Sequence, residues 1–358
     1  MIQLTLPAVS DAKKPFVTRL SRSRSSLPHD SWCIQSTENE TVFSGESGLF
    51  QISGPSLKTL EGDIVIITPA VGKAERIIRA GSTQNSLLVT ERCDQLCVMC
   101  SQPPKKTHND RFDLFIQACL LTEKGITIGI TGGEPTLFKH ELFHLLEAVL
   151  ELRPDLNFHV LTNGQHFEPH DIPQLRQPKF RNVVWGIPLY SDEAIEHDQI
   201  VAKAGAHERL HQSFDTLLSA GARIELRTVV LQSNLNSFPA LARHVSSLLH
   251  FIEQWSVMHL ENIGFAKNRW DSLYVDFRNS FGSISEALDI VTLFGVQSKL
   301  FNVPLCHLPE SYRHFAVNSI SDWKQRFGER CSMCNSKAAC SGFFEWHPSK
   351  ILDEVVPI

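Results

Sequence analysis

From residue 87 onward, short apolar runs alternate with longer segments in which apolar residues recur every three or four positions. Apolar runs of strand length lie within 87–90, 126–131, 157–164, 181–190, 222–231 and 255–264, and the third of them runs into a turn. The segment between the second and third runs places Phe138, Leu142, Leu145, Leu146 and Val149 on one face of a helix. Strands that alternate with helices predict a parallel sheet with helices outside it. Six such strands predict an α/β fold, a partial (βα)6 TIM-like barrel over residues 85–295.

The segments on either side follow different patterns. Residues 1–84 contain short apolar stretches interrupted by glycine and proline, which predicts a small β-rich module. An exposed strand edge in this module could hold an extended peptide. Residues 296–358 form a cysteine-rich C-terminal region. We therefore predict three domains, 1–84, 85–295 and 296–358.

Composition narrows the class of protein. The 358 residues carry a net charge of -5, with 42% apolar and 20% charged residues, so bulk charge gives no reason to expect nucleic acid. The N-terminal residues lack the pattern of a signal peptide, and no apolar run approaches the ~20 residues that span a membrane. We predict a cytoplasmic protein. Its nine cysteines are then expected to serve as metal ligands or redox groups rather than as a disulfide framework.

Three of these cysteines lie directly after the first predicted strand of the barrel. Cys93, Cys97 and Cys100 form a C-x3-C-x2-C pattern. A structural zinc site needs four ligands, so a distant residue would have to complete it. In an iron–sulfur cube each of four irons usually takes one protein ligand, so three cysteines leave one iron open. The position at a strand's C-terminal end, where barrels carry their chemistry, favours the cluster.

A second motif follows the next predicted strand. Gly132, Gly133, Glu134 and Pro135 come directly after the apolar run 126–131. Glycines allow a ligand to approach the backbone closely. Backbone groups there could hold an amino acid's ammonium or carboxylate group, and Glu134 adds a negative charge. The alternative is a tight turn between strand and helix.

With both motifs in this order, the sequence resembles the radical S-adenosylmethionine (radical SAM) superfamily. The resemblance implies that Cys93, Cys97 and Cys100 hold a catalytic [4Fe–4S] cluster whose open iron binds S-adenosylmethionine. Reductive cleavage of that cofactor gives a 5′-deoxyadenosyl radical, which takes a hydrogen atom from the substrate. It also implies cofactor contacts from Met99, Gly132, Gly133, Glu134, Pro135, Asn163 and Arg227.

Two of these assignments have alternatives, and a third departs from the family's usual pattern. Asn163 belongs to "LTNG" after the third strand, a stretch that could be a simple turn. Arg227 matches a position where related enzymes pair a basic residue with the cofactor carboxylate, but a surface ion pair is the alternative. Met99 stands where the family often has an aromatic residue, so its contact to adenine would be through the backbone.

The tail cysteines add a second candidate metal site. Four thiolates can close a [4Fe–4S] cluster or a tetrahedral zinc site, and spacing does not separate the two metals. Radical SAM peptide-modifying enzymes resemble this layout, with auxiliary clusters near the C-terminus, which favours iron and sulfur. The four residues are Cys306, Cys331, Cys334 and Cys340.

Finer details narrow the resemblance. "CSQPPK", "GITGGEPTLF", "LTNG" and the closing "CSGFF" are similar to the His-Xaa-Ser system radical SAM maturase of the HxsC type. That resemblance implies a ribosomally made precursor peptide (RiPP) as substrate, modified after translation. A sister radical SAM maturase and a small accessory protein are implied partners, with flavodoxin or ferredoxin as reductant. The alternatives are a radical SAM enzyme acting on a small molecule or RNA, and a non-enzymatic zinc-stabilised binding protein.

Residues after the fourth predicted strand are weaker candidates. Tyr190, His197 and Asp198 lie on the side where substrate should enter, so they could contact substrate or move a proton. A solvated helix start is the alternative interpretation.

Overall fold

The computed structural model describes residues 2–24 and 27–358. The chain forms two compact units that are interleaved along the sequence. The first comprises residues 1–89, 109–131 and 138–159, and the second comprises 90–108, 132–137 and 160–358. The predicted boundaries after residues 84 and 295 follow sequence segments rather than these units, and the three-domain division stays a prediction.

The N-terminal residues form a closed β-barrel, which agrees with the predicted β-rich module. Seven strands pair in the order β1-β5-β4-β3-β2-β6-β7, and β7 pairs back to β1. Closure pairs every described strand on both sides, so the described part of the barrel offers no free edge for the strand addition considered from the sequence. The barrel elements are β1 (Thr5–Ser10), β2 (Phe16–Ser21), β3 (Asp30–Ser36), β4 (Glu40–Gly45), β5 (Gly48–Ser53), α1 (Leu57–Leu60), β6 (Ile64–Thr68) and β7 (Lys73–Ile78).

A buried ion pair lies within this module. Arg76 Nε donates to Asp63 Oδ2 at 2.5 Å, and the two side chains are 3% and 2% exposed. The other guanidinium nitrogens donate to the carbonyl oxygens of Gln3 and Thr59, and Asp63 Oδ1 accepts from the Ala80 N–H. The pair therefore ties together segments that are up to 73 residues apart.

Replacing Arg76 with methionine is expected to destabilise the barrel. The substitution leaves the Asp63 carboxylate buried without its counter-charge, which typically costs about 3–5 kcal/mol. Urea unfolding followed by circular dichroism measures the loss. Arg22→Met is the matched control, because Arg22 and Glu61 form an exposed pair, 59% and 45% accessible. Equal unfolding midpoints for the two variants would contradict this account.

The predicted barrel strands form one seven-stranded sheet in the order β14-β13-β12-β11-β10-β9-β8. The six predicted strands are all present, and a seventh, which the sequence analysis missed, follows them. The pairs from β11 to β14 are parallel. The strands are β8 (Asn85–Thr90), β9 (Thr127–Gly132), β10 (Asn157–Leu161), β11 (Val183–Pro188), β12 (Arg223–Val229), β13 (Gln254–Met258) and β14 (Ser298–Phe301).

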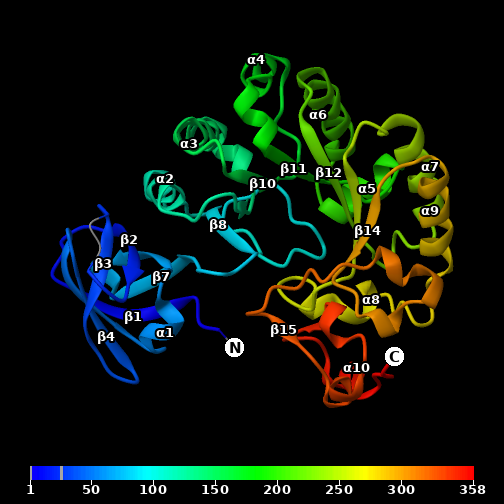
Figure 1. Ribbon diagram of the computed structural model, residues 1–358. Helices are drawn as coiled ribbons and strands as arrows, with labels where there is room; N and C mark the ends of the chain where they lie inside the picture. The colour runs from blue at the N-terminus through cyan, green and yellow to red at the C-terminus, as the bar shows by residue number, and fades with distance from the viewer. Residues whose placement is uncertain (1, 25–26) are drawn as a thin grey trace. The chain divides into compact units, whose positions relative to one another are not determined.

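The two faces of strands β11–β14 differ sharply. One face is apolar and fully covered: Trp185, Leu226 and Trp255 are 0% exposed. Trp255 stacks on Phe238 of α7, 5.9 Å away. Figure 1 shows α6, α7 and α9 along this side of the sheet. The other face carries Glu225, Arg227, Gln254, Ser256 and Lys299, which share a side because paired residues point the same way.

The helices follow the predicted pattern of crossovers. α6 ends at Ala220, and the following Gly221 adopts φ +69°, the left-handed conformation common at the C-terminal ends of helices. The helices of both units are α2 (Phe112–Leu120), α3 (Lys139–Leu152), α4 (Ile172–Leu175), α5 (Ala194–Val201), α6 (Ala206–Ala220), α7 (Phe238–Leu248), α8 (Trp270–Leu273) and α9 (Gly282–Leu293).

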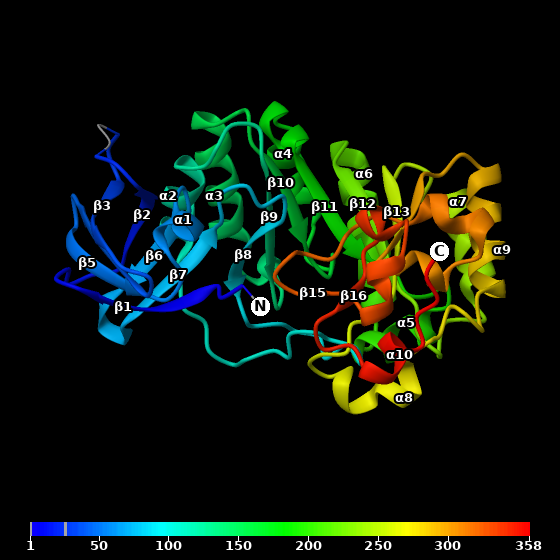
Figure 2. The ribbon, with the colours of Figure 1, turned by 60° about the horizontal axis from the view of Figure 1, so that its bottom comes forward.

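The C-terminal segment has little regular structure. It contains a two-stranded antiparallel pair, β15 (Gln325–Arg326) with β16 (Phe343–Phe344), and the short helix α10 (Ser349–Asp353). Figure 2 shows these elements in the segment coloured orange to red. Among residues 2–24 and 27–358, none of the helices has the length and apolar character needed to cross a membrane.

Candidate active site

The three-cysteine loop runs from the end of β8 across several neighbouring segments. It has no helix or strand of its own, so its shape depends on backbone hydrogen bonds to those segments. The Val98 N–H donates to Ile200 O at 2.8 Å, and the Phe265 N–H donates to Cys100 O at 2.9 Å. The loop is thus fixed at the C-terminal end of α5 and at the segment after β13.

Gly132 and Gly133 lie against the start of this loop. The Gly133 N–H donates to Thr90 O at 2.8 Å, and the Glu134 N–H donates to Arg92 O at 2.7 Å. A Cβ on Gly133 would lie 2.2 Å from Arg92 O, and one on Gly132 would lie 2.7 Å from Thr90 O. Glycine is required here because the cysteine loop itself approaches the backbone, a reason the sequence did not reveal.

Glu134 is fully buried, and its carboxylate joins two strand ends. Oε1 accepts from the Thr136 N–H at 2.8 Å and from the Thr136 and Thr162 hydroxyls, both at 2.6 Å. Oε2 accepts from the Asn163 N–H at 2.5 Å. Burial raises the pKa of Glu134, and these hydrogen bonds oppose the rise. The side chain therefore holds the ends of β9 and β10 together, and its predicted contact with the cofactor stays a prediction.

Asn163 connects this network to the cysteine loop. Its Nδ2 donates to Asp94 Oδ1 at 2.8 Å, and Asp94 directly follows Cys93. Asp94 Oδ2 accepts from Lys203 Nζ and lies 3.1 Å from His166 Nε2. Burial acts to raise the pKa of Asp94, but hydrogen bonds from His166 and Lys203 hold it below its usual range. Asp94 thus anchors the first cysteine to two other segments.

Arg227 contacts side chains on its own strand and on the neighbouring strand β13. Its Nη1 donates to both carboxylate oxygens of Glu225, at 3.0 and 2.9 Å, and Nη2 lies 3.2 Å from the Met258 sulfur. Glu225 also accepts from the Ser256 hydroxyl. The guanidinium is therefore paired on the polar face of the sheet, as the ion-pair alternative expected. Its contact with a cofactor carboxylate stays a prediction.

Met99 and Pro135 are both packed into the protein. Met99 is 7% exposed and belongs to an apolar cluster with Tyr190, Leu231 and Leu260. Pro135 is buried and begins a short 3-10 turn that leads into α3. Their predicted contacts with the cofactor stay predictions.

The weaker candidates after β11 have structural partners. The Tyr190 N–H donates to His197 Nδ1 at 3.3 Å, and burial lowers the pKa of His197 to about 3. The Asp198 carboxylate accepts from the backbone N–H groups of Gly205 and His207 at the start of α6. His197 and Asp198 lie within α5, which begins at Ala194, and His197 is buried rather than solvated. The predicted roles of Tyr190, His197 and Asp198 toward substrate stay predictions.

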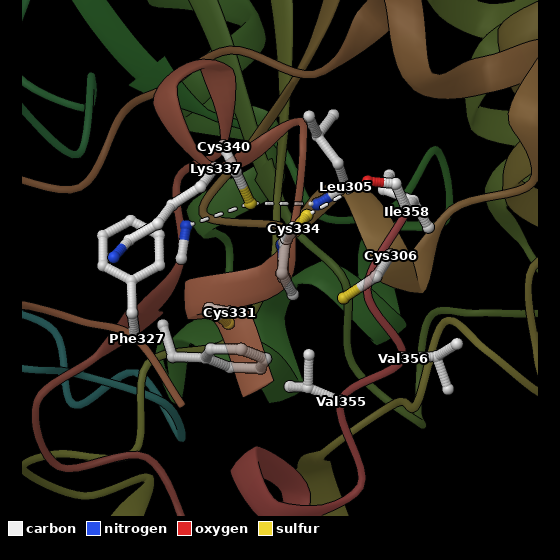
Figure 3. A pocket seen from close by; sticks show the side chains of 13 residues that line it. Leu305, Cys306, Phe327, Cys331, Cys334, Lys337, Cys340, Val355, Val356 and Ile358 are labelled. Atoms are coloured by element: carbon white, nitrogen blue, oxygen red, sulfur yellow. Dashed lines mark hydrogen bonds between the residues drawn. The ribbon is translucent and has the colours of Figure 1, made fainter. Parts of the chain in front are cut away.

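The four tail cysteines line one cavity (Figure 3). Cys340 Sγ accepts from the backbone N–H groups of Leu305 and Gly342, both at 3.3 Å. The remaining lining is mainly apolar and includes Phe327 and Val355. Burial raises the pKa of the Cys306 thiol to about 12, and the neighbouring thiols add to the rise. A bound metal reverses this preference, since a coordinated thiol loses its proton.

The donor set at both cysteine sites suits soft metals or iron–sulfur clusters. Burial likewise raises the pKa of the Cys93 and Cys97 thiols to about 12. In the part of the chain that the structure describes, no three His, Cys, Asp or Glu side chains converge closely enough to hold a single metal ion. A cubane asks for a wider spacing, because each cysteine binds a different iron. The ligand assignments at both sites stay predictions.

Residues 87–245 match the radical SAM superfamily. This segment is therefore similar to a radical SAM domain, in agreement with the superfamily predicted from sequence. The match is to the superfamily as a whole, so the HxsC subtype stays a prediction.

The individual relatives described next share 27% sequence identity or less with this chain. GTP 3',8-cyclase of Nautilia profundicola is 27% identical over 151 residues, which is 40% of this chain and 46% of that protein. SuiB of Streptococcus suis bound to S-adenosylmethionine superposes with a TM-score of 0.51 at 15% identity, over 62% of this chain and 51% of SuiB. SuiB bound to its precursor peptide SuiA gives 0.50 at 14%, over 62% and 49%. The chain thus spans about half the length of these relatives.

Sequence reasoning missed Asp94, Thr162 and Lys203. An acid beside the first cysteine was visible, but Asn163 and Lys203 lie 69 and 109 residues away from it. No local pattern connects residues at such separations. Thr162 stands in the quoted "LTNG" stretch, where only Asn163 was singled out.

Proposed function

We propose that this chain is a radical SAM enzyme whose catalytic [4Fe–4S] cluster is held by Cys93, Cys97 and Cys100. The observation that carries the proposal is a three-thiol loop fixed against Gly132 and Gly133 at the strand ends of a radical SAM domain. When bound, the cluster and S-adenosylmethionine would supply a 5′-deoxyadenosyl radical for hydrogen abstraction. The chain's own residues hold the cysteine loop in place through backbone hydrogen bonds from Gly133 and Glu134.

The proposed substrate is a ribosomally made precursor peptide of the His-Xaa-Ser type, modified in the cytoplasm. Two observations support it: the resemblance to HxsC-type maturases, and a fold similar to that of SuiB, which binds its precursor peptide SuiA. The proposed partners are a sister radical SAM maturase, a small accessory protein and a reductant of the flavodoxin or ferredoxin class.

The tail cysteines are proposed to hold an auxiliary [4Fe–4S] cluster, with zinc as the alternative. All four line one cavity, and backbone N–H groups already point at the Cys340 sulfur. Hydrogen bonds to ligand sulfurs are one way in which proteins tune such clusters.

Anaerobic iron, sulfide and zinc counts test the metal assignments. Wild type is expected to hold about eight irons per chain, and a Cys93/Cys97/Cys100 triple Ala variant about four, because each cubane contributes four. Four irons and one zinc in wild type would make the tail site structural. Zinc without iron after reconstitution would refute a radical SAM activity and leave a binding protein.

A second candidate substrate is a nucleotide, because the sequence also matches a GTP 3',8-cyclase. The reconstituted enzyme can be given a synthetic His-Xaa-Ser repeat peptide or GTP, with S-adenosylmethionine and reductant. Mass spectrometry of the peptide and chromatography of GTP show which one is consumed. Modified peptide with intact GTP supports the maturase, whereas the reverse result supports the nucleotide enzyme.

A further inference from the structure

A continuous series of rings begins beside the three-cysteine loop. Trp270 and Tyr274 stack with their centroids 4.3 Å apart, and both pack against the apolar cluster that includes Met99, with Cys97 also packed on it. Arg269 Nη1, one residue before Trp270, donates to Val98 O within the loop at 3.0 Å. The first rings of the series are therefore held at the loop.

The series continues to the four-cysteine cavity. His347 meets Trp270 edge-on at 5.4 Å and Tyr274 at 5.9 Å. Phe343 lies 5.3 Å from His347 and lines the cavity itself. Phe343 and Cys331 share one apolar cluster, against which Cys306 also packs. Adjacent rings thus connect the two cysteine sites through Trp270, Tyr274, His347 and Phe343.

This region is not built as an ordinary apolar core. The Tyr274 hydroxyl, His347 Nε2 and both ring nitrogens of His307 are buried without a hydrogen-bond partner among the described residues. His307 and His347 are only 2% and 4% exposed. Each buried polar atom without a partner costs about 1–3 kcal/mol. Leucine or phenylalanine would fill the same space without that cost, so the chain retains these rings for a property other than packing.

We propose that Trp270, Tyr274, His347 and Phe343 form an electron path between the two cysteine sites. This inference rests on the proposed function, namely that each site holds a [4Fe–4S] cluster. With both clusters bound, cleavage of one S-adenosylmethionine would break one carbon–sulfur bond and take one electron from the catalytic cluster. The four rings would then carry one electron from the reduced auxiliary cluster to the oxidised catalytic cluster, and no proton would move.

Ring contacts suit this role for a physical reason. Electron tunnelling weakens steeply with the length of each gap and with saturated chain in between. Conjugated rings at centroid distances of 4.3 to 5.4 Å leave only short gaps along the series. Replacing one ring with an aliphatic side chain widens a gap while keeping the site apolar.

The test follows the auxiliary cluster directly. Holoenzyme is reduced with dithionite, desalted, mixed with S-adenosylmethionine and freeze-quenched for EPR. The triple Ala variant at Cys93, Cys97 and Cys100 supplies the spectrum of the auxiliary cluster alone. In wild type, both cluster signals should decay and about two methionines form per chain, one for each cubane's electron. Trp270→Leu is made together with Tyr274→Leu, because Tyr274 also contacts His347; in this variant the catalytic signal should decay as before, while the auxiliary signal decays about tenfold more slowly.

Two further variants separate the path from general damage. Trp270→Phe keeps a ring and should stay near the wild-type rate. Trp323→Leu removes an indole from the C-terminal segment that is not in the series, since its ring neighbour is Trp346, and should have no effect. Phe343→Leu replaces the double Leu variant if that variant does not fold.

Each remaining outcome overturns the proposal. An auxiliary signal that persists in wild type, or that decays equally fast in the double Leu variant, rules out the path. An iron count of four, or zinc in the tail, overturns the two-cluster assignment together with the path. The metal count therefore distinguishes failure of the proposed function from failure of the path alone.

Discussion

Replacing Glu134 with glutamine is expected to destabilise the chain by about 2–4 kcal/mol, because one buried carboxylate accepts four hydrogen bonds. If the amide oxygen takes the place of Oε1, its NH2 group faces the Asn163 N–H, and two donors oppose each other. The ends of β9 and β10 would then separate. Anaerobic urea unfolding measures the loss, and the iron content should fall with it.

A matched control keeps this result interpretable. Glu123 is exposed, so Glu123→Gln should change stability by no more than about 0.5 kcal/mol. Thr162→Val removes one of the four donors and should fall between the two, at about 1 kcal/mol. A Glu134→Gln variant as stable as Glu123→Gln would mean that the carboxylate does not hold the strand ends.

Replacing Gly133 with alanine should empty the catalytic site although all three cysteines remain. The new Cβ would lie 2.2 Å from Arg92 O and 3.0 Å from Cys93 Cβ, so the backbone of the cysteine loop must move. Iron is expected to fall by about four per chain, the content of one cubane. The tail site should keep its metal, because it lies in a separate part of the second unit.

Gly282→Ala is the control for this substitution. Gly282 is exposed at the start of α9, has no left-handed backbone and has no atom within 4 Å of an added Cβ. This variant should keep its full metal content. Unchanged iron in Gly133→Ala would show that the loop can shift without losing its cluster, and would refute the close-approach account.

The periodic parts of the fold could be predicted from sequence because their signals are local. The helices α3, α6 and α7 bury residues three or four positions apart along their whole length. The six predicted strands are apolar runs of five to seven residues. β14 has only four residues, too few for a period to show. Closure of the N-terminal barrel could not be predicted from sequence either, because β1 pairs with β7 across more than sixty residues of chain.

The candidate site also has parts that could be predicted from sequence and parts that could not. The cysteine loop and the Gly132–Pro135 stretch are contiguous motifs, so they could be recognised. The Arg227–Glu225 pair was within reach as well, since residues two apart in a strand point to the same side. The partners of Asp94 were not, because they come from two other elements far along the chain.

The residues that fix the cysteine loop are synthesised after the cysteines themselves. Ile200 and Phe265, which fix the loop at Val98 and Cys100, are translated well after the cysteines. Counted from Cys100, the ribosome needs on the order of 10–30 s to reach Phe265 at about 5–20 residues per second. During that interval the loop lacks its Phe265 partner, so its backbone can take up the final conformation that holds the three thiols only after most of the second unit has been synthesised.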